Sequence, residues 1–357
     1  MNQEKLNALL AAGARYGASD VHLKVDDPPL FRINGLLTPI QHDRLRPTDL
    51  DALAQIVGRA RDPNIRVADL QDLDCSYQVE GVGRFRVNVY RQRGVLSIVM
   101  RFIPREVPTI DAMLLPPALK KIAETERGLI LVTGATGSGK SSTLAAMIRH
   151  INSTRRCHIL TIEDPIEFLH TSNVAVVSQR ELGSDTKTFG GALRSALRQD
   201  PDVIMVGEMR DAESIDIGLK AGETGHVVYS TVHTTDAAKT LGRLLGVFPA
   251  EEQRTVTYRI ADTLKATISQ RLLPRADGRG RVAACEIMVV TNTIREHLAD
   301  GRPASGLKDL MQRGGDSGMQ TFDQHLSKLY QAGIITLQAA MEASTNPADF
   351  QRALHFQ

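Results

Sequence analysis

The sequence lacks several residues and patterns that would mark particular classes of protein. It has no tryptophan, and aromatic residues make up only 4% of its 357 residues. Its three cysteines, Cys75, Cys157 and Cys285, are far apart, so they form no CxxC pair that could bind zinc or act as a redox motif. We therefore interpret them as isolated reduced thiols.

Long apolar runs are missing as well. The N-terminal residues 1–12 are charged and amphipathic, without the apolar stretch of a signal peptide. No segment approaches the roughly 20 consecutive apolar residues that a membrane-spanning helix needs. These absences predict a cytoplasmic protein without a transmembrane segment.

The charge balance gives no reason to expect a nucleic-acid or lipid ligand. Lysine and arginine number 43 against 41 acidic residues, a formal net charge of +2, so no global attraction to polyanions is expected. Hydrophobic residues make up 42% of the chain and charged residues 24%, which is typical of a globular protein. The length suits two domains.

The first part of the chain mixes helical and strand-like patterns. Helical spacing occurs at Leu6, Leu9 and Leu10 and again over residues 50–57. Runs typical of strands occupy residues 21–25, 30–33, 75–79, 84–90 and 95–102. We therefore expect an α+β domain over residues 1–103. Prolines at positions 104, 108, 116 and 117 then predict a semi-rigid linker over residues 104–120.

The remainder, residues 121–357, has the pattern of an α/β domain. An apolar strand at residues 128–133 leads into a glycine-rich turn and then into a helix over residues 141–151. Further buried-strand patterns occupy residues 159–162, 174–177, 203–206 and 227–231. Helical segments between them predict a mostly parallel sheet covered by helices. The residues after about position 250 are mainly helical in pattern.

The glycine-rich turn carries the most specific motif. Residues 134–141 read GATGSGKS and match G-x-x-x-x-G-K-[ST] between a strand and a helix. In such a loop, successive amide groups and the helix N-terminus face phosphate oxygens. Lys140 would neutralise the β- and γ-phosphates, and the Ser141 hydroxyl would bind Mg²⁺. The predicted nucleotide-binding residues are Gly134, Ala135, Thr136, Gly137, Ser138, Gly139, Lys140, Ser141 and Ser142.

Two acidic residues stand where predicted strands end. Glu163 follows the strand at residues 159–162, and Glu208 comes shortly after the strand at residues 203–206. The carboxyl ends of parallel strands form the edge at which open α/β sheets bind ligands. Such an acid is more often a solvated loop residue, but beside a P-loop it can bind metal or activate water. We predict that Glu163 and Glu208 supply the acidic groups that a nucleoside triphosphatase needs near its metal ion and near the attacking water.

Histidines and arginines near these strands are further candidates. His226 and His233 flank the strand at residues 227–231 without a third metal ligand at suitable spacing, so they are ordinary histidines or imidazoles that donate to a γ-phosphate. Arg194 and Arg198 share one face of a predicted helix. Spacing alone favours a solvated basic face for this pair. Arg210 closely follows the second of the two acids.

Together, four of these motifs resemble the Walker A, Asp box, Walker B and His box of the secretion and pilus ATPase superfamily. They occur in that order at residues 134–141, 161–167, 197–211 and 224–234. The likeness extends to residues 17–23 and 83–88 and so covers nearly the whole chain. It implies a PAS-like α+β N-terminal domain, followed by a RecA-like P-loop ATPase core with a helical C-terminal part. It also implies ATP and ADP, with Mg²⁺, as ligands.

The resemblance further implies roles for individual residues. Glu163 and Glu208 would act on water and Mg²⁺, with Glu208 activating the water. His233 and His226 would sense the γ-phosphate. A positively charged clamp would close the domains around the nucleotide and stabilise charge on the transferring phosphoryl group. The matching arginines are Arg86, Arg101, Arg194, Arg198 and Arg210.

Within the superfamily the chain is similar to the type IV pilus retraction branch. It lacks the tetracysteine zinc subdomain of the assembly and type II secretion ATPases, and residues 248–252 and 319–324 look like those of the retraction branch. The implied function is a homohexameric ATPase at the inner-membrane base of the pilus. It would act on a membrane platform protein and so power pilus retraction and twitching motility.

The sequence leaves other functions open. Residues 306–314 depart from the helix found at this place in the principal retraction motor, which also fits an accessory ring that works with a second retraction ATPase. Pilus assembly or type II secretion is a further alternative. A nucleic-acid translocase would need a basic or aromatic-lined channel, which the composition disfavours. A nucleotide-binding scaffold without turnover would be free to lose Lys140, Ser141, Glu163 and Glu208, and the presence of all four residues weighs against this alternative.

Overall fold

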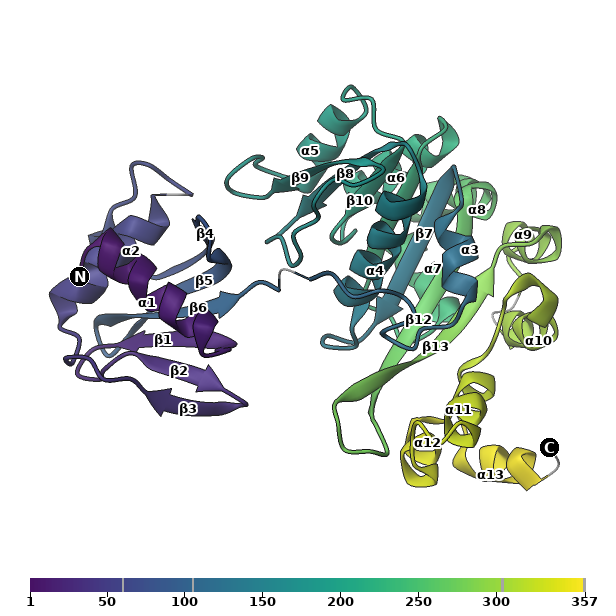
Figure 1. Ribbon diagram of the computed structural model, residues 1–357. Helices are drawn as coiled ribbons and strands as arrows, with labels where there is room; N and C mark the ends of the chain where they lie inside the picture. Colours follow the sequence, from purple (N-terminus) through teal and green to yellow (C-terminus); the bar gives the residue numbers. More distant parts are fainter. Residues whose placement is uncertain (60, 105, 303–304, 356–357) are drawn as a thin grey trace. The chain divides into compact units, whose positions relative to one another are not determined.

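The computed structural model describes residues 1–59, 61–104, 106–302 and 305–355, which form two compact units (Figure 1). Unit 1 comprises Met1–Glu106, Asp164–Leu169 and Glu181–Lys187. Unit 2 comprises Val107–Glu163, His170–Arg180 and Thr188–Gln357. Two short segments from later in the chain therefore belong to unit 1, in addition to the N-terminal domain that the sequence predicts.

Unit 1 is built on one antiparallel sheet with the strand order β3-β2-β1-β6-β5-β4. Side chains alternate along its strands, and buried residues such as Phe85 and Val87 pack against helix residues such as Leu6 and Leu50. Its elements are α1 (Gln3–Arg15), β1 (Asp20–Lys24), β2 (Leu30–Ile33), β3 (Leu36–Pro39), α2 (Pro47–Gly58), the 3-10 helix η1 (Val67–Asp69), β4 (Asp72–Val79), β5 (Gly83–Gln92) and β6 (Val95–Phe102).

Strand β3 is the one element of this sheet that the sequence analysis missed. Asn34 and Gly35, with φ of 51° and 84°, form the two-residue turn between β2 and β3 that an Asn-Gly pair favours. All of β3 is exposed, so the strand has no buried apolar alternation that could have revealed it. The Asn-Gly pair was the available signal.

Unit 2 is built on a mixed sheet with the strand order β13-β12-β7-β11-β10-β8-β9. Strands β8, β10, β11, β7 and β12 pair in parallel, and β13 is antiparallel to β12. The strands are β7 (Gly128–Gly134), β8 (His158–Glu163), β9 (Val176–Glu181), β10 (Val203–Val206), β11 (Val227–Val232), β12 (Leu264–Pro274) and β13 (Arg281–Val289).

Helices surround this sheet (Figure 1). They are α3 (Ala118–Ala123), α4 (Lys140–Thr154), α5 (Phe189–Ala196), α6 (Ala212–Glu223), α7 (Ala237–Leu245), α8 (Ala250–Thr263), α9 (Asn292–Ala299), α10 (Ser305–Arg313), the 3-10 helix η2 (Gly315–Ser317), α11 (Phe322–Gln331), α12 (Leu337–Ala343) and α13 (Pro347–His355). Helices α4 and α6 both contact β7 and β11 in the middle of the sheet. The glycine-rich turn between β7 and α4 is thus held by central elements of the unit.

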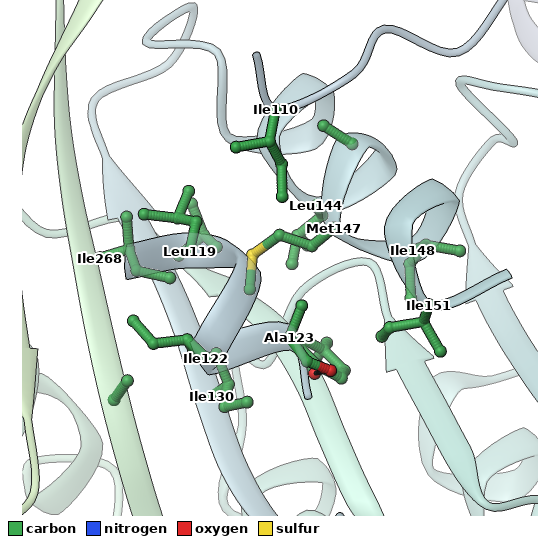
Figure 2. Packing of buried hydrophobic residues seen from close by; sticks show 14 of the residues in the cluster. Ile110, Leu119, Ile122, Ala123, Ile130, Leu144, Met147, Ile148, Ile151 and Ile268 are labelled. Carbon is green, nitrogen blue, oxygen red and sulfur yellow. Dashed lines mark hydrogen bonds between the residues drawn. The ribbon is translucent and has the colours of Figure 1, made fainter. Parts of the chain in front are cut away.

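Strand β7 is buried along its whole length, which explains its continuous apolar sequence. Its residue Ile130 lies in one cluster with Leu119 and Ile122 of α3 and with Leu144 and Met147 of α4 (Figure 2). This packing fixes the start of α4 relative to the end of β7.

The predicted linker, residues 104–120, is in large part a packed portion of unit 2. Ile110, Leu115 and Leu119 are almost fully buried in the same cluster as β7 and α4. The prolines were interpreted as linker residues, but Pro117 is the N-cap residue of α3, and proline is readily accommodated at the start of a helix. The apolar residues between the prolines were the better signal.

Beside the predicted C-terminal helices, the chain after residue 250 forms the strand pair β12 and β13. Ala266 and Ile268 of β12 alternate into the central cluster. The buried neighbours Thr267, Ser269 and Gln270 are polar, so an apolar pattern does not identify this strand. Because β12 pairs with β7, the missed strand directly flanks the glycine-rich turn.

His325 is a buried residue of α11, the helix that packs against β13. Its side chain is 6% exposed, and its Nδ1 accepts a hydrogen bond of 2.8 Å from the backbone N–H of Cys285. Burial, with a smaller contribution from Lys328, lowers the pKa of His325 from 6.5 to about 4. The imidazole is therefore neutral in the folded protein at pH 7.

We predict that His325 makes the protein less stable as the pH falls from 7 to 5. Because the folded pKa of about 4 lies below the unfolded value of 6.5, the unfolded chain binds the proton first, and the stability from the neutral imidazole is lost between these values. The wild type should lose about 2 kcal/mol more of its free energy of unfolding than His325→Gln over this range. Urea unfolding at both pH values measures this difference.

The control is His42→Gln, which replaces an exposed histidine of unit 1. Its unfolding should show the same dependence on pH as the wild type. Equal losses for wild type and His325→Gln would contradict the prediction.

Candidate active site

The P-loop, residues 134–141, connects the end of β7 to the first turn of α4. Gly137 and Gly139 have φ of 77° and 89°, and a Cβ at either position would meet open space. Glycine is needed there for the backbone conformation. Gly139 is the N-cap residue of α4, and no side chain caps the helix. The first amide groups of α4 thus point to a position suited to an anion.

Polar side chains within the loop also suit phosphate groups. Lys140 is 7% exposed, and its Nζ donates to the carbonyl oxygens of Gly134 and Ala135, both at 3.0 Å. The Ser138 hydroxyl is buried and finds no hydrogen-bond partner among residues 1–59, 61–104, 106–302 and 305–355. A buried ammonium and a buried unpaired hydroxyl around an uncapped helix end fit the phosphates of a nucleotide. Ser141 follows in the first turn of α4 and is half-buried.

The acidic candidates lie at the same edge of the sheet as the P-loop. Strands β7, β11, β10 and β8 run parallel, with Thr133 paired to Val232 and Val206 paired to both Ser230 and Ile162. Their carboxyl ends therefore meet at one edge. The residues that follow these ends are the P-loop, His233, Glu208 and Glu163. This arrangement is the one from which α/β proteins build ligand sites.

Glu208 sits between two basic side chains. Its Oε2 lies 2.6 Å from Arg210 Nε and 3.5 Å from His233 Nε2, and the Glu208 side chain is 20% exposed. The Thr231 hydroxyl donates a 2.7 Å hydrogen bond to the carbonyl oxygen of Gly207, which fixes the backbone next to the acid. The structure thus brings together three of the predicted site residues.

Glu163 has a different environment. It is 7% exposed, and its Oε1 accepts hydrogen bonds from the Thr161 hydroxyl at 2.7 Å and from Gln179 Nε2 at 3.1 Å. These donors are neutral groups. Gln179 was missed by the sequence analysis, because the apolar pattern of β9 ends at Val177, before the polar half of the strand.

Strand β12 forms the other flank of the P-loop. A Cβ on Gly134 would come within 2.8 Å of the Gln270 carbonyl oxygen, so the two backbones approach closely. Gln270 Nε2 donates to the Thr143 hydroxyl of α4 at 2.9 Å, and the Thr133 hydroxyl donates to Ser269 at 2.9 Å. These contacts tie the P-loop strand and its helix to β12, and the sequence analysis missed them together with the strand.

A cavity of about 290 Å³ opens beside the P-loop. It is lined by Ala135, Thr136, Gly137, Ser138, Thr235, Gln270, Arg271, Leu272 and Arg281. Its volume approaches that of a typical small-molecule site. Four of its lining residues belong to the predicted phosphate-binding loop.

His226 does not lie with the other candidates. It precedes β11, and its backbone carbonyl accepts from the N–H of Gly128 at the start of β7. The whole of β11, about 20 Å long for six residues, separates it from the P-loop edge. The prediction that His226 senses the γ-phosphate does not fit a nucleotide bound to this chain's own P-loop. Instead, its Nδ1 lies 3.1 Å from the Ala221 carbonyl oxygen, at the end of α6.

The remaining arginines have their own neighbours within each unit. Arg194 pairs with Glu213, and Arg198 donates to the Arg194 carbonyl oxygen at 3.4 Å. In unit 1, Arg86 and Arg101 are cross-strand neighbours on β5 and β6. Arg101 Nε lies 2.8 Å from Asp20 Oδ1.

The sequence of this chain is similar to those of known ATPases that carry out related functions. The family described as "Type II/IV secretion system protein" matches residues 2–342. The chain is 44% identical over 350 residues to the type IV pilus retraction ATPase PilT of Pseudomonas aeruginosa, covering 97% of this chain and 99% of that protein. It is 38% identical over 352 residues to the type IV pilus ATPase PilU of the same organism, covering 98% and 91% of the two chains.

A solved structure of the pilus retraction motor PilT with bound ADP superimposes with a TM-score of 0.87 at 42% identity, covering 97% of this chain and 99% of that one. This likeness confirms the predicted α/β fold with its RecA-like core. The family predicted from the motifs is also confirmed, and the chain belongs to the type II/IV secretion system protein family.

Proposed function

We propose that the chain is an ATPase motor that powers type IV pilus retraction. The observation that carries this proposal is the P-loop edge with Glu208, Arg210 and His233 in contact, in a chain related over nearly its whole length to a retraction ATPase. The same function explains why two acids and a histidine follow parallel strands beside a phosphate-binding loop.

The P-loop would bind the phosphates of ATP. The amide groups at the start of α4 face the phosphate oxygens, and Lys140 would leave the two carbonyl groups it contacts for the β- and γ-phosphates. Ser141 and Glu208 would hold Mg²⁺, which when bound neutralises charge on the phosphates. Residues Gly134–Ser142 thus form the nucleotide site of the proposal.

Glu208 would orient the attacking water and accept its proton. The water oxygen bonds to the γ-phosphorus, the bond from that phosphorus to the bridging oxygen breaks, and ADP and phosphate leave. Arg210 and His233 hold the Glu208 carboxylate, and His233 would also donate to the γ-phosphate. Glu163, fixed by two neutral donors, would be the second acid at the nucleotide.

The other arginines would act when the motor assembles. Arg86, Arg101, Arg194 and Arg198 have the donor geometry to clamp phosphate oxygens. We propose that the chain forms a homohexamer and that these residues close the domains around nucleotide. The ring would act at the inner-membrane base of the pilus, on its cytoplasmic side, and pass motion to a membrane platform protein. No helix in the described part of the chain is long and apolar enough to cross a membrane.

One observation favours an accessory role as a second candidate. The chain is 38% identical to PilU as well as 44% identical to PilT, and the departure at residues 306–314 that the resemblance implies would fit an accessory ring. An accessory ATPase would bind nucleotide and work with a second retraction motor. Measuring turnover of the purified chain alone separates the two.

We predict that Lys140→Ala lowers the ATPase rate at least about 100-fold, because it removes the cation that neutralises the phosphates. The rate is measured by phosphate release at saturating ATP and Mg²⁺. The matched control is Lys220→Ala, which removes a lysine of α6 that pairs with Asp216, and it should turn over like the wild type. Normal turnover in Lys140→Ala would rule out this P-loop as the hydrolysis site.

For Glu208→Ala we expect nucleotide binding to persist while hydrolysis falls at least about 100-fold, since the carboxylate acts on water and metal rather than on the phosphates. Binding is followed with a fluorescent ATP analogue, and turnover by phosphate release. Tight binding with near-normal turnover would remove Glu208 from the catalytic role.

We predict that assembly of the hexamer changes the ATPase rate. If sites are completed between subunits, the ATPase rate per chain rises with protein concentration as a hexamer-sized species forms. Size-exclusion chromatography with light scattering follows assembly in the same samples. A constant rate per chain from a monomer would contradict the ring motor, and an assembled but inactive protein would support the accessory role.

A further inference from the structure

Gln179 makes two hydrogen bonds that fix its amide group. Its Nε2 donates to Glu163 Oε1 at 3.1 Å, and its Oε1 accepts from the backbone N–H of His170 at 2.8 Å. All three residues belong to unit 2. The side chain thus joins the catalytic candidate to the backbone seven residues after it along the chain.

The orientation of this amide follows from the chemistry of its partners. A backbone N–H can only donate, so the atom of Gln179 that faces His170 must be the oxygen. The amide nitrogen therefore faces Glu163, where it can only donate, and Glu163 Oε1 must accept. Thr161 donates to the same oxygen at 2.7 Å. Two fixed donors on one oxygen leave the Glu163 carboxylate little freedom to rotate.

We propose that Gln179 is a positioning residue that sets the direction of the Glu163 carboxylate. This inference rests on the proposed function, in which Glu163 acts at the nucleotide. The proposed effect of Gln179 on turnover passes through its hydrogen bond to Glu163. Its loss should therefore lower kcat and leave nucleotide affinity unchanged.

A second residue of β9 holds the chain after Glu163. Glu181 is 3% exposed, and its carboxylate accepts from the Ile166 N–H at 3.0 Å, the Ser76 hydroxyl at 2.6 Å and Arg84 Nη2 at 3.0 Å. These contacts lie within unit 1. Gln179 and Glu181 are two apart and so share one face of β9.

Gln179 is the better residue to test, because removing Glu181 would leave the half-buried Arg84 without its carboxylate partner and endanger folding. We expect Gln179→Ala to lower kcat about tenfold, the effect of one hydrogen bond, with unchanged affinity for a fluorescent ATP analogue. The matched control is Ser178→Ala, on the neighbouring position of β9, whose hydroxyl lies 2.9 Å from His158 Nε2. Ser178→Ala should keep the wild-type kcat.

Two further variants separate positioning from packing. Gln179→Glu keeps the size of the side chain but replaces the donor by a second carboxylate facing Glu163, so it should be slower than Gln179→Ala. In a Glu163→Ala background, Gln179→Ala should cause no further loss, because its effect passes through the missing carboxylate. If Gln179 served packing alone, Gln179→Glu would keep a higher kcat than Gln179→Ala. The losses of kcat caused by Glu163→Ala and by Gln179→Ala would then add in the double variant.

The outcomes distinguish this inference from the proposed function. A wild type without turnover overturns the proposed function and this inference with it. Glu163→Ala with wild-type turnover overturns the role of Glu163 and this inference, while the proposed ATPase function stands. An inactive Glu163→Ala beside a Gln179→Ala variant with wild-type kcat overturns only the inference. Circular dichroism and thermal unfolding of each variant establish that the compared proteins are folded.

Discussion

The parallel pairing of β7, β8, β10 and β11 is the constraint on which the rest of the structure depends. Because neighbouring strands end at the same edge, residues up to about 100 positions apart in the sequence meet beside the P-loop. The apolar cluster beneath α4 holds the loop end of β7 (Figure 2). The positions of the site residues therefore depend more on the pairing of the strands and on core packing than on the loops that contain these residues.

The two glutamates of this edge stand in contrasting surroundings. Glu208 is partly exposed between a guanidinium and an imidazole, so its position can change when a phosphate group competes for those cations. Glu163 is buried and held by neutral donors from β8 and β9. Those two hydrogen bonds orient the Glu163 carboxylate. The two acids therefore differ in their exposure and in the groups that hold them.

Local signals predicted much of the fold and part of the site. The P-loop and the acids after β8 and β10 were recognised because each combines a short motif with an apolar strand. Gln179, Gln270 and the packed segment 107–120 were missed, because their roles arise from pairing with distant strands and from burial. His226 precedes β11, whereas the P-loop and His233 follow their strands, so His226 lies at the opposite edge of the parallel sheet. The order of the residue and its strand along the chain was the available signal.

The pairing of β12 with β7 joins residues such as Thr133 and Ser269, which are 136 positions apart. During synthesis, β7 and the P-loop leave the ribosome long before β12 has been made. Until then, the edge of β7 that pairs with β12 is unpaired and apolar. The phosphate-binding loop can be completed only when nearly three-quarters of the chain has been made. The β12 side of β7 is therefore among the last parts of this sheet to be paired, and an unpaired apolar strand edge favours aggregation.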